Sequence, residues 1–161
     1  MADRSPRYLP VLLAVAVAMA ATACGGSSGK SATTSSSAAR SSLPNACPAD
    51  GCKVRIVSVS GAGTEMKISF DANYSPDVSR NHFHVYWDTF TAKQVSDDAE
   101  PRFHVTQGAW VPTGDNPFTT TDAVSVSVRK GSTTVCVTAG DRNHNVIDPA
   151  LFDCRAVADL L

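Results

Sequence analysis

The sequence predicts an all-β fold, built as an antiparallel β-sandwich. Two observations support this prediction. Several short segments are rich in β-branched residues or alternate apolar and polar residues, and Gly, Asn and Pro residues separate them. In addition, no segment keeps a 3.6-residue apolar period over the length of a helix. Roughly six to eight strands at such close spacing favour a sandwich over an α/β architecture.

The first two predicted strands are residues 53–60 and 65–72, joined by a Gly-Ala-Gly turn. The apolar phase of the first strand shifts between Ile56 and Val57, which predicts a β-bulge or burial on both faces. The second strand alternates cleanly, so one of its faces is expected to be buried. That face carries Met66, Ile68 and Phe70.

The third predicted strand begins at residue 82, ends near residue 90, and differs on its two faces. Because successive side chains of a strand point to opposite sides, every second residue shares a face. The face expected to pack in the core carries Phe83, Val85 and Trp87. The opposite face, which is the first candidate for a functional site, carries His82, His84, Tyr86 and Asp88.

The second half of the chain is expected to add shorter strands. Residues 103–105 and 109–111 are each predicted to form a short strand in a region with little periodicity. Residues 123–128 and 133–139 alternate on either side of a Lys-Gly-Ser turn, which predicts a hairpin. Residues 156–161 are long enough for a final helical turn only.

Residues 1–43 are expected to lie outside the folded domain. A basic start precedes an apolar run at residues 11–21, which has the length of a signal-peptide core and is too short to span a bilayer. The next twenty or so residues are almost entirely Gly, Ser, Thr and Ala, a composition that predicts a disordered tether. The predicted organisation is a signal peptide at 1–23, a tether at 24–43 and a β-sandwich domain at 44–161.

The end of the apolar run resembles a bacterial lipobox. The residues that carry the resemblance are Ala21-Thr22-Ala23-Cys24-Gly25, although the family usually has Leu where Ala21 stands. The resemblance implies that Cys24 receives acyl chains such as palmitate. These would anchor the protein to the extracytoplasmic face of a bacterial cell membrane, since each buried methylene contributes about 0.8 kcal/mol. The alternative is an ordinary secretory signal that is cleaved near Ala23.

Four cysteines remain once Cys24 is set aside, namely Cys47, Cys52, Cys136 and Cys154. An even number in an exported domain predicts two disulfides, and four cysteines allow three connectivities. We favour Cys47–Cys52, which closes a short turn at the start of the domain, together with Cys136–Cys154, which ties a late strand to the C-terminal segment. Zinc is the competing interpretation of the first pair, but the sequence has no second closely spaced pair to complete such a site.

Two resemblances concern the domain as a whole. Trp87 and a disulfide that reaches a late strand are similar to features of immunoglobulin-like and fibronectin-like domains. This resemblance implies the architecture alone, because the usual Cys–Trp–Cys order is missing. The His-x-His strand and the loop Gly140-Asp141-x-Asn143-His144 resemble uncharacterised exported β-sandwich domains of bacteria, over roughly residues 81–154. The second resemblance implies an envelope location and no established activity.

The histidines are the candidate metal ligands. His82 and His84 project from the same face of one strand, which suits a single metal ion, and imidazole is a favoured ligand of copper and zinc. His104 and His144 remain to complete the set. Their order faintly resembles copper–zinc superoxide dismutases, but 4 histidines are too few for the two-metal site of that family, which leaves a copper-only arrangement. The alternative is that the histidines bond backbone and loop groups at the edge of the sandwich.

The remaining candidate sites rest on fewer residues. Tyr86 and Trp110 are candidates to line a ligand-binding surface, together with Asp141 and Asn143. The loop that starts at Asp141 begins like an EF-hand but lacks its glycine and final glutamate, so a tight turn is expected there. The sequence contains neither a Gly-x-Ser-x-Gly elbow nor a phosphate-binding Gly-rich loop.

The sequence therefore supports two functional hypotheses. The leading one is a lipid-anchored, extracytoplasmic binding or accessory module of the bacterial envelope. It would be a monomer without cofactor or enzymatic activity, and its partner would be an envelope protein or a cell-wall ligand. The other is a mononuclear copper or zinc protein that uses the His-x-His strand to bind the metal. This second hypothesis includes redox activity. Nucleic acid is not expected as a partner, because the net charge is -1 and no run of Lys or Arg occurs.

Overall fold

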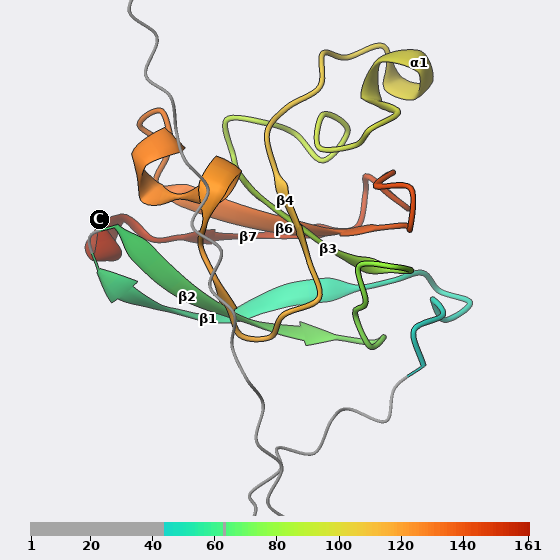
Figure 1. Cartoon of the computed structure of the whole chain (residues 1–161), viewed down its shortest axis with the longest axis horizontal. Helices are drawn as coiled ribbons and strands as arrows, with labels where there is room; N and C mark the ends of the chain where they lie inside the picture. The colour runs from blue at the N-terminus through green and yellow to red at the C-terminus, as the bar shows by residue number, and fades with distance from the viewer. Residues whose placement is uncertain (1–43, 63) are drawn as a thin grey trace, which may run out of the picture. The chain divides into compact units, whose positions relative to one another are not determined.

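The computed structural model describes residues 44–62 and 64–161. The predicted signal peptide, tether and lipidation site at Cys24 lie outside these residues. The described residues form two antiparallel sheets and only short helices, which confirms the predicted all-β fold (Figure 1). The sheet that contains β1 and β2 forms one layer, and the sheet that contains β3, β6 and β7 forms the other.

The first sheet has the strand order β1-β2-β5, with β1 at Val54–Ala62, β2 at Glu65–Ala72 and β5 at Phe118–Thr119. The register between β1 and β2 shifts between Ile56 and Ser58, and the side chain of Val57 between them is 52% exposed. The phase shift in the sequence therefore corresponds to a bulge, as predicted. The expected buried face of β2 is confirmed as well, because Met66, Ile68 and Phe70 all belong to the core.

The second sheet has the strand order β4-β3-β6-β7. Its strands are β4 at Val111–Thr113, β3 at His82–Trp87, β6 at Thr134–Gly140 and β7 at Phe152–Ala156. Strand β3 lies between β4 and β6 and pairs with β6 along its whole length, from His82 opposite Gly140 to Trp87 opposite Val135. This central place holds the backbone of the histidine-bearing strand on both sides.

The main core fills the space between the two sheets. Phe83, Val85 and Trp87 point into it and are at most 1% exposed, which confirms the prediction for this face of β3. Phe83 packs against Phe70 of the opposite sheet, with 4.8 Å between the ring centroids. Aromatic pairs at this distance add stability beyond the area they bury.

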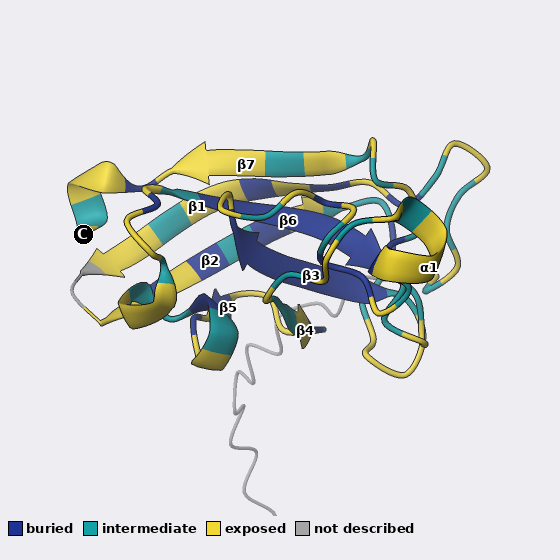
Figure 2. Cartoon of the chain, turned by 90° about the horizontal axis from the view of Figure 1, so that it is seen from above, coloured by how far each residue is buried: buried dark blue, intermediate teal, exposed yellow. Residues whose placement is uncertain are grey.

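The outer face of β3 is also covered. Residues 88–110, which we call the covering segment, cross this face and contain the short helix α1 at Ala99–Phe103 (Figure 1). A second, smaller core forms beneath them from Tyr86, Ala92, Val95, Cys136 and Val146. As a result every residue of β3 is buried, which Figure 2 shows as an unbroken dark strand. Strand β3 therefore lies between two cores. Its histidines, His82 and His84, lie on the side of the second, smaller core.

Part of the predicted hairpin is wrong. Residues 123–128 form two 3-10 helices, η1 at Asp122–Val124 and η2 at Val126–Val128, instead of a strand. The reason is that the alternating valines do not define a buried face, since Val124 is fully buried whereas Val128 is 44% exposed. Strand β6 pairs instead with β3 and with β7, and β7 was not predicted because its side chains are mostly exposed and show no apolar alternation.

The predicted strand at residues 103–105 is also wrong. Phe103 is the last residue of α1, and His104 follows it in the left-handed conformation with φ 56°. The His104 backbone N–H donates to the carbonyl of Glu100 at 3.0 Å, so this segment closes a helix instead of joining a sheet. Strand β4 begins at Val111, two residues later than the predicted strand at 109–111.

Both favoured disulfides are present, Cys47–Cys52 and Cys136–Cys154. The second joins directly paired residues of β6 and β7. Two disulfides indicate an oxidising, extracytoplasmic environment for the domain. In the part of the chain that the structure describes, none of the helices has the length and apolar character needed to cross a membrane.

Candidate metal centre

Three of the four histidines meet at one end of the outer face of β3. His82 and His84 come from the strand itself, and His144 comes from the loop that follows β6. The Nε2 atom of His82 lies 3.1 Å from Nε2 of His84 and 3.1 Å from Nδ1 of His144. All three nitrogen atoms lie within 4.8 Å of one another. We call His82, His84 and His144 the histidine cluster.

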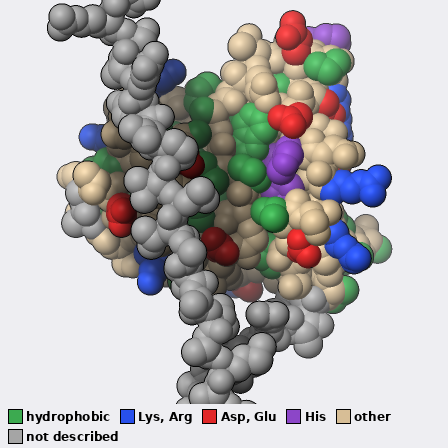
Figure 3. Space-filling view, viewed as in Figure 1, with side chains coloured by type: hydrophobic (Ala, Val, Ile, Leu, Met, Phe, Trp, Pro, Cys, Tyr) green, Lys and Arg blue, Asp and Glu red, His purple; other side chains and the backbone are tan. Residues whose placement is uncertain are grey.

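The cluster reaches solvent on one side. His82 and His84 are fully buried, whereas His144 is partly exposed. Figure 3 shows histidine side chains at the surface of this face, next to hydrophobic and acidic side chains. The cluster is therefore buried at the strand and open at the loop.

His84 has its free nitrogen fixed by a backbone contact. Its Nδ1 atom lies 2.6 Å from the carbonyl oxygen of Val95, an acceptor, so Nδ1 carries the proton and donates. The Nε2 atom consequently presents a lone pair to the cluster. Burial lowers the pKa of His84 to about 3, so the ring is neutral at physiological pH. This is the protonation state that a metal ligand needs.

Gly140 makes room for the His84 ring. A Cβ atom at this position would lie 2.6 Å from Cδ2 and 2.7 Å from Cε1 of His84, and closer still to Nε2. The backbone of Gly140 does not have a positive φ, so glycine is not required here for its conformation. We infer that the missing side chain serves the close approach of His84. In the sequence Gly140 belongs to a loop motif, and no local signal indicates this role.

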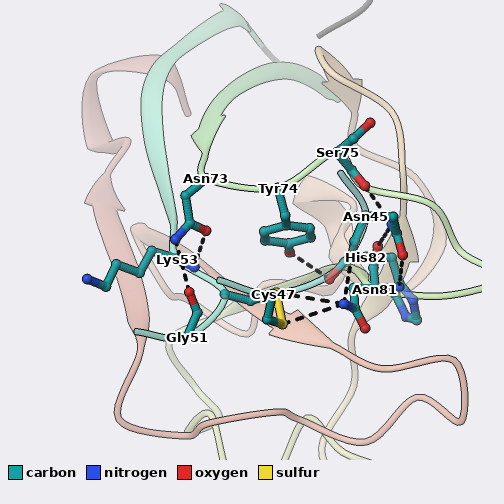
Figure 4. Close-up of a disulfide and its surroundings, with 10 residues drawn as sticks. Asn45, Cys47, Gly51, Lys53, Asn73, Tyr74, Ser75, Asn81 and His82 are labelled. Carbon is teal, nitrogen blue, oxygen red and sulfur yellow. Dashed lines mark hydrogen bonds between the residues drawn. A yellow bond between two sulfur atoms is a disulfide. The ribbon is translucent and has the colours of Figure 1, made fainter. Parts of the chain in front are cut away.

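Hydrogen bonds to the N-terminal segment of the domain fix the backbone next to His82 (Figure 4). The hydroxyl of Tyr74 donates to the His82 carbonyl at 3.1 Å, and the preceding residue Asn81 exchanges hydrogen bonds with Asn45. The Asn81 amide also lies 3.5 Å from the sulfur of Cys47, beside the first disulfide. The Cys47–Cys52 loop therefore helps to fix the start of β3.

The ring of His82 is buried with incomplete hydrogen bonding. Its Nδ1 atom has no hydrogen-bond partner, and among the described residues it is the one buried side-chain N or O atom in this condition. Burial, and next the neighbouring His144 ring, lower the pKa of His82. The nearby backbone of Arg80 acts in the opposite direction and raises the pKa of His82. It does not form a hydrogen bond with Nδ1, however. His82 is thus kept neutral.

His144 is presented by a tight loop of residues 141–146, which we call the histidine loop. One carboxylate oxygen of Asp141 accepts from the backbone N–H groups of Asn143, at 2.8 Å, and Asn145, at 3.0 Å. His144 itself has φ 58°, a left-handed conformation that is uncommon for residues other than glycine and asparagine. The expected tight turn pinned by Asp141 is confirmed. A histidine at a strained backbone position is consistent with a functional role.

One short stretch of the covering segment, residues 95–98, positions two of the three clustered histidines. The carbonyl oxygen of Val95 accepts from Nδ1 of His84. The N–H of Asp97 donates to the His144 carbonyl at 3.0 Å. The N–H of Asp98 donates to the Asn145 side chain at 3.1 Å. The hydroxyl of Ser96, which is fully buried, accepts from the N–H of Val146 at 3.0 Å and donates to Asp98. These residues carry no local signal of a site in the sequence.

The other predicted site residues lie outside the cluster or at its rim. His104 is exposed at the end of α1 and is not among the three clustered histidines, so the structure brings together three of the four predicted histidines. Trp110 stacks on His84, with 5.3 Å between the ring centroids and 25° between the planes. Tyr86 is buried in the second core, and Asn143 is exposed in the histidine loop. The predicted site residues therefore reduce to His82, His84, His144 and Trp110, with Asp141 as a support.

The three ring nitrogens that meet in the cluster share few protons. Nε2 of His84 is an acceptor. A proton on Nε2 of His82 must therefore be shared between Nε2 of His84 and Nδ1 of His144, each 3.1 Å away. If that proton is on Nδ1 of His82 instead, the Nε2 lone pairs of His82 and His84 face each other at 3.1 Å. A cation at the centre of the three nitrogens resolves both arrangements, because it interacts with every lone pair at once.

The spacing of the nitrogens fits such a cation. Tetrahedral imidazole ligands at about 2.0–2.1 Å from zinc have nitrogens separated by about 3.3 Å. The two 3.1 Å separations are a few tenths of an ångström shorter, and the third is at most 4.8 Å. Two of the three separations are therefore close to those of a tetrahedral metal site.

Comparisons with known proteins add no functional assignment. No protein-family model matches the chain, and searches of curated proteins and of solved structures return no significant match. The functional argument therefore rests on the geometry of the histidine cluster.

Proposed function

We propose that this domain binds one transition-metal ion through His82, His84 and His144. The observation that carries the proposal is the convergence of three imidazole nitrogens within 4.8 Å of one another. Nε2 of His82 lies 3.1 Å from a ring nitrogen of each of the other two histidines, and this supports a cation shared by the three rings. Such an arrangement is more readily explained by metal binding than by organisation of the sheet edge.

The ligand set favours copper over zinc. The three ligands are all imidazoles, and in the described part of the chain no carboxylate or thiolate joins them. Nitrogen ligands suit copper and zinc and disfavour calcium and magnesium, which require oxygen. For a fixed set of ligands copper(II) binds most tightly among the first-row divalent ions. We therefore propose a mononuclear copper centre, with zinc as the competing ion, and assign no reaction to it.

The first prediction concerns His144→Asn. Asparagine tolerates the left-handed conformation, so the substitution removes a ligand without new backbone strain. We expect wild-type protein to bind one copper(II) ion per chain and the variant to bind it on the order of 100-fold more weakly, because losing a ligand costs at least as much as losing a supporting residue. Competition with a chelator measures the affinity, and electron paramagnetic resonance reports the coordinating nitrogens. Both proteins carry Cys24→Ser, which removes a competing thiol.

His104→Asn provides a matched control. His104 has φ 56°, nearly the value of His144, but lies exposed at the end of α1. We expect this variant to keep the wild-type affinity and spectrum. Equal copper binding by all three proteins, or none above background in the wild type, would contradict the proposed metal centre.

We further propose that the protein is held on the outer face of a bacterial cell membrane by acyl chains on Cys24. The lipobox-like residues before Cys24 support this location, and so does the oxidised state of the four domain cysteines. We also propose that the β-sandwich is immunoglobulin-like. Such a fold accords with a module of the bacterial envelope. In this setting the metal centre would face the extracytoplasmic medium.

The second prediction tests the anchor. Replacing Cys24 by Ser removes the acylated sulfur, so the protein should move from the membrane fraction to the soluble fraction of the envelope. Metabolic labelling with a palmitate analogue should mark the wild type and leave the variant unlabelled. A variant that remains membrane-bound, or a wild type without label, would exclude lipidation at Cys24.

A further inference from the structure

A pocket lies beside the histidine cluster. It has a volume of about 340 Å³ and is lined on one side by His144 and Trp110, which we use to name it the Trp110 pocket. Its other lining residues are Asp97, Gln107, Gly108, Ala109, Pro112 and Ala123. The pocket is therefore formed by the covering segment, β4, η1 and the histidine loop.

Three contacts connect the pocket wall to the cluster. Trp110 stacks on the ring of His84, and Pro112 of β4 pairs with His84 across the sheet. Asp97 donates its backbone N–H to the carbonyl of His144 at 3.0 Å. His144 lines the pocket, and Trp110 of its wall stacks on His84, so the pocket lies beside the proposed metal position.

The number of protein ligands leaves room for one more. Structural zinc sites have four protein ligands, whereas catalytic sites have three and keep a position for water or substrate. Among residues 44–62 and 64–161 the cluster consists of three histidines and has no fourth His, Cys, Asp or Glu. A metal held by the histidine cluster is thus short of one ligand on the side of the pocket.

We propose that this metal takes a small exogenous ligand, water or an anion that replaces it, through the Trp110 pocket, and that Asp97 disfavours the anion. The inference rests on the proposed metal centre and adds its fourth ligand. The Asp97 carboxylate is held in the pocket wall by the side-chain amide of Gln107, which donates to its Oδ1 at 3.0 Å. A negative charge at this place repels anions and accepts hydrogen bonds from bound water.

Azide titration of the copper(II)-loaded, full-length Cys24→Ser protein tests the inference. We expect azide to produce a ligand-to-metal charge-transfer band, because azide replaces water at the open position. In Asp97→Asn the repulsion is lost, and azide should bind roughly two- to tenfold more tightly. Asp159→Asn, which removes an exposed charge near the C-terminus, should bind azide as the wild type does.

A second variant blocks the pocket without touching a ligand. Ala123 belongs to η1 and lines the pocket, so Ala123→Trp fills part of its volume. We expect azide binding to weaken about tenfold or more while the copper spectrum in the absence of azide stays unchanged. This result would show that the pocket is the route to the metal.

The outcomes separate the two proposals. Failure of copper to bind in a histidine-dependent way would overturn the metal centre itself. Copper that binds normally but gives no azide band would overturn the open position. Azide binding that is unaffected by both Asp97→Asn and Ala123→Trp would show that the ligand reaches the metal by another route.

Discussion

Gly140→Ala is expected to abolish the metal centre while leaving a folded protein. The new methyl group would occupy the space of the His84 imidazole, so Nε2 of His84 must move away from the cluster. We expect copper affinity to fall on the order of 100-fold or more, since loss of a supporting contact alone costs 10- to 100-fold. Overpacking of this kind costs about 1–3 kcal/mol of unfolding free energy, so the variant should remain folded at room temperature.

The measurement pairs copper affinity with chemical denaturation of the metal-free protein. Gly131→Ala is the control, because its Cβ atom would meet nothing within 4 Å although φ is +84° there. It should lose about 1 kcal/mol through backbone strain and keep the wild-type affinity. If Gly140→Ala binds copper as tightly as the wild type, the close approach of Gly140 to His84 is not needed for copper binding.

The parts of the fold that were predictable from the sequence are those with a local pattern. The two faces of β3 follow from strict alternation, and both disulfides follow from the number and placement of the cysteines. The bulge in β1 was visible as a shift of apolar phase at Ile56. The valines of residues 123–128 show the limit of this approach, because alternation predicts a strand only where one face is buried.

The candidate site was predictable in part. His82 and His84 share a face by their spacing, but the set predicted from the sequence contained His104 as well as His144. The loop after β6 brings His144 to His82 because Gly140 of β6 pairs with His82, whereas His104 lies exposed at the end of α1. Gly140 and the residues of 95–98 act through contacts between segments far apart in the chain, which no local pattern reveals.

Ser96→Ala is expected to weaken both the fold and the metal centre, although Ser96 does not contact the histidine cluster. The substitution leaves the buried N–H of Val146 without a partner and removes the bond to Asp98. An unsatisfied buried group costs about 1–3 kcal/mol, which should appear as a lower unfolding free energy of the metal-free protein. Because Val146 ends the histidine loop, His144 should lose its fixed position.

Copper affinity separates a positioning role from a purely structural one. If Ser96 positions His144, the folded variant should bind copper about 10- to 100-fold more weakly, the range for residues that orient metal ligands. Ser127→Ala, which removes a hydroxyl from an exposed site, should change neither quantity. A Ser96→Ala protein that is destabilised but binds copper like the wild type would limit this serine to stability. The expected result would instead mean that the covering segment, by fixing His84 and His144 together, turns a covered sheet face into a metal site.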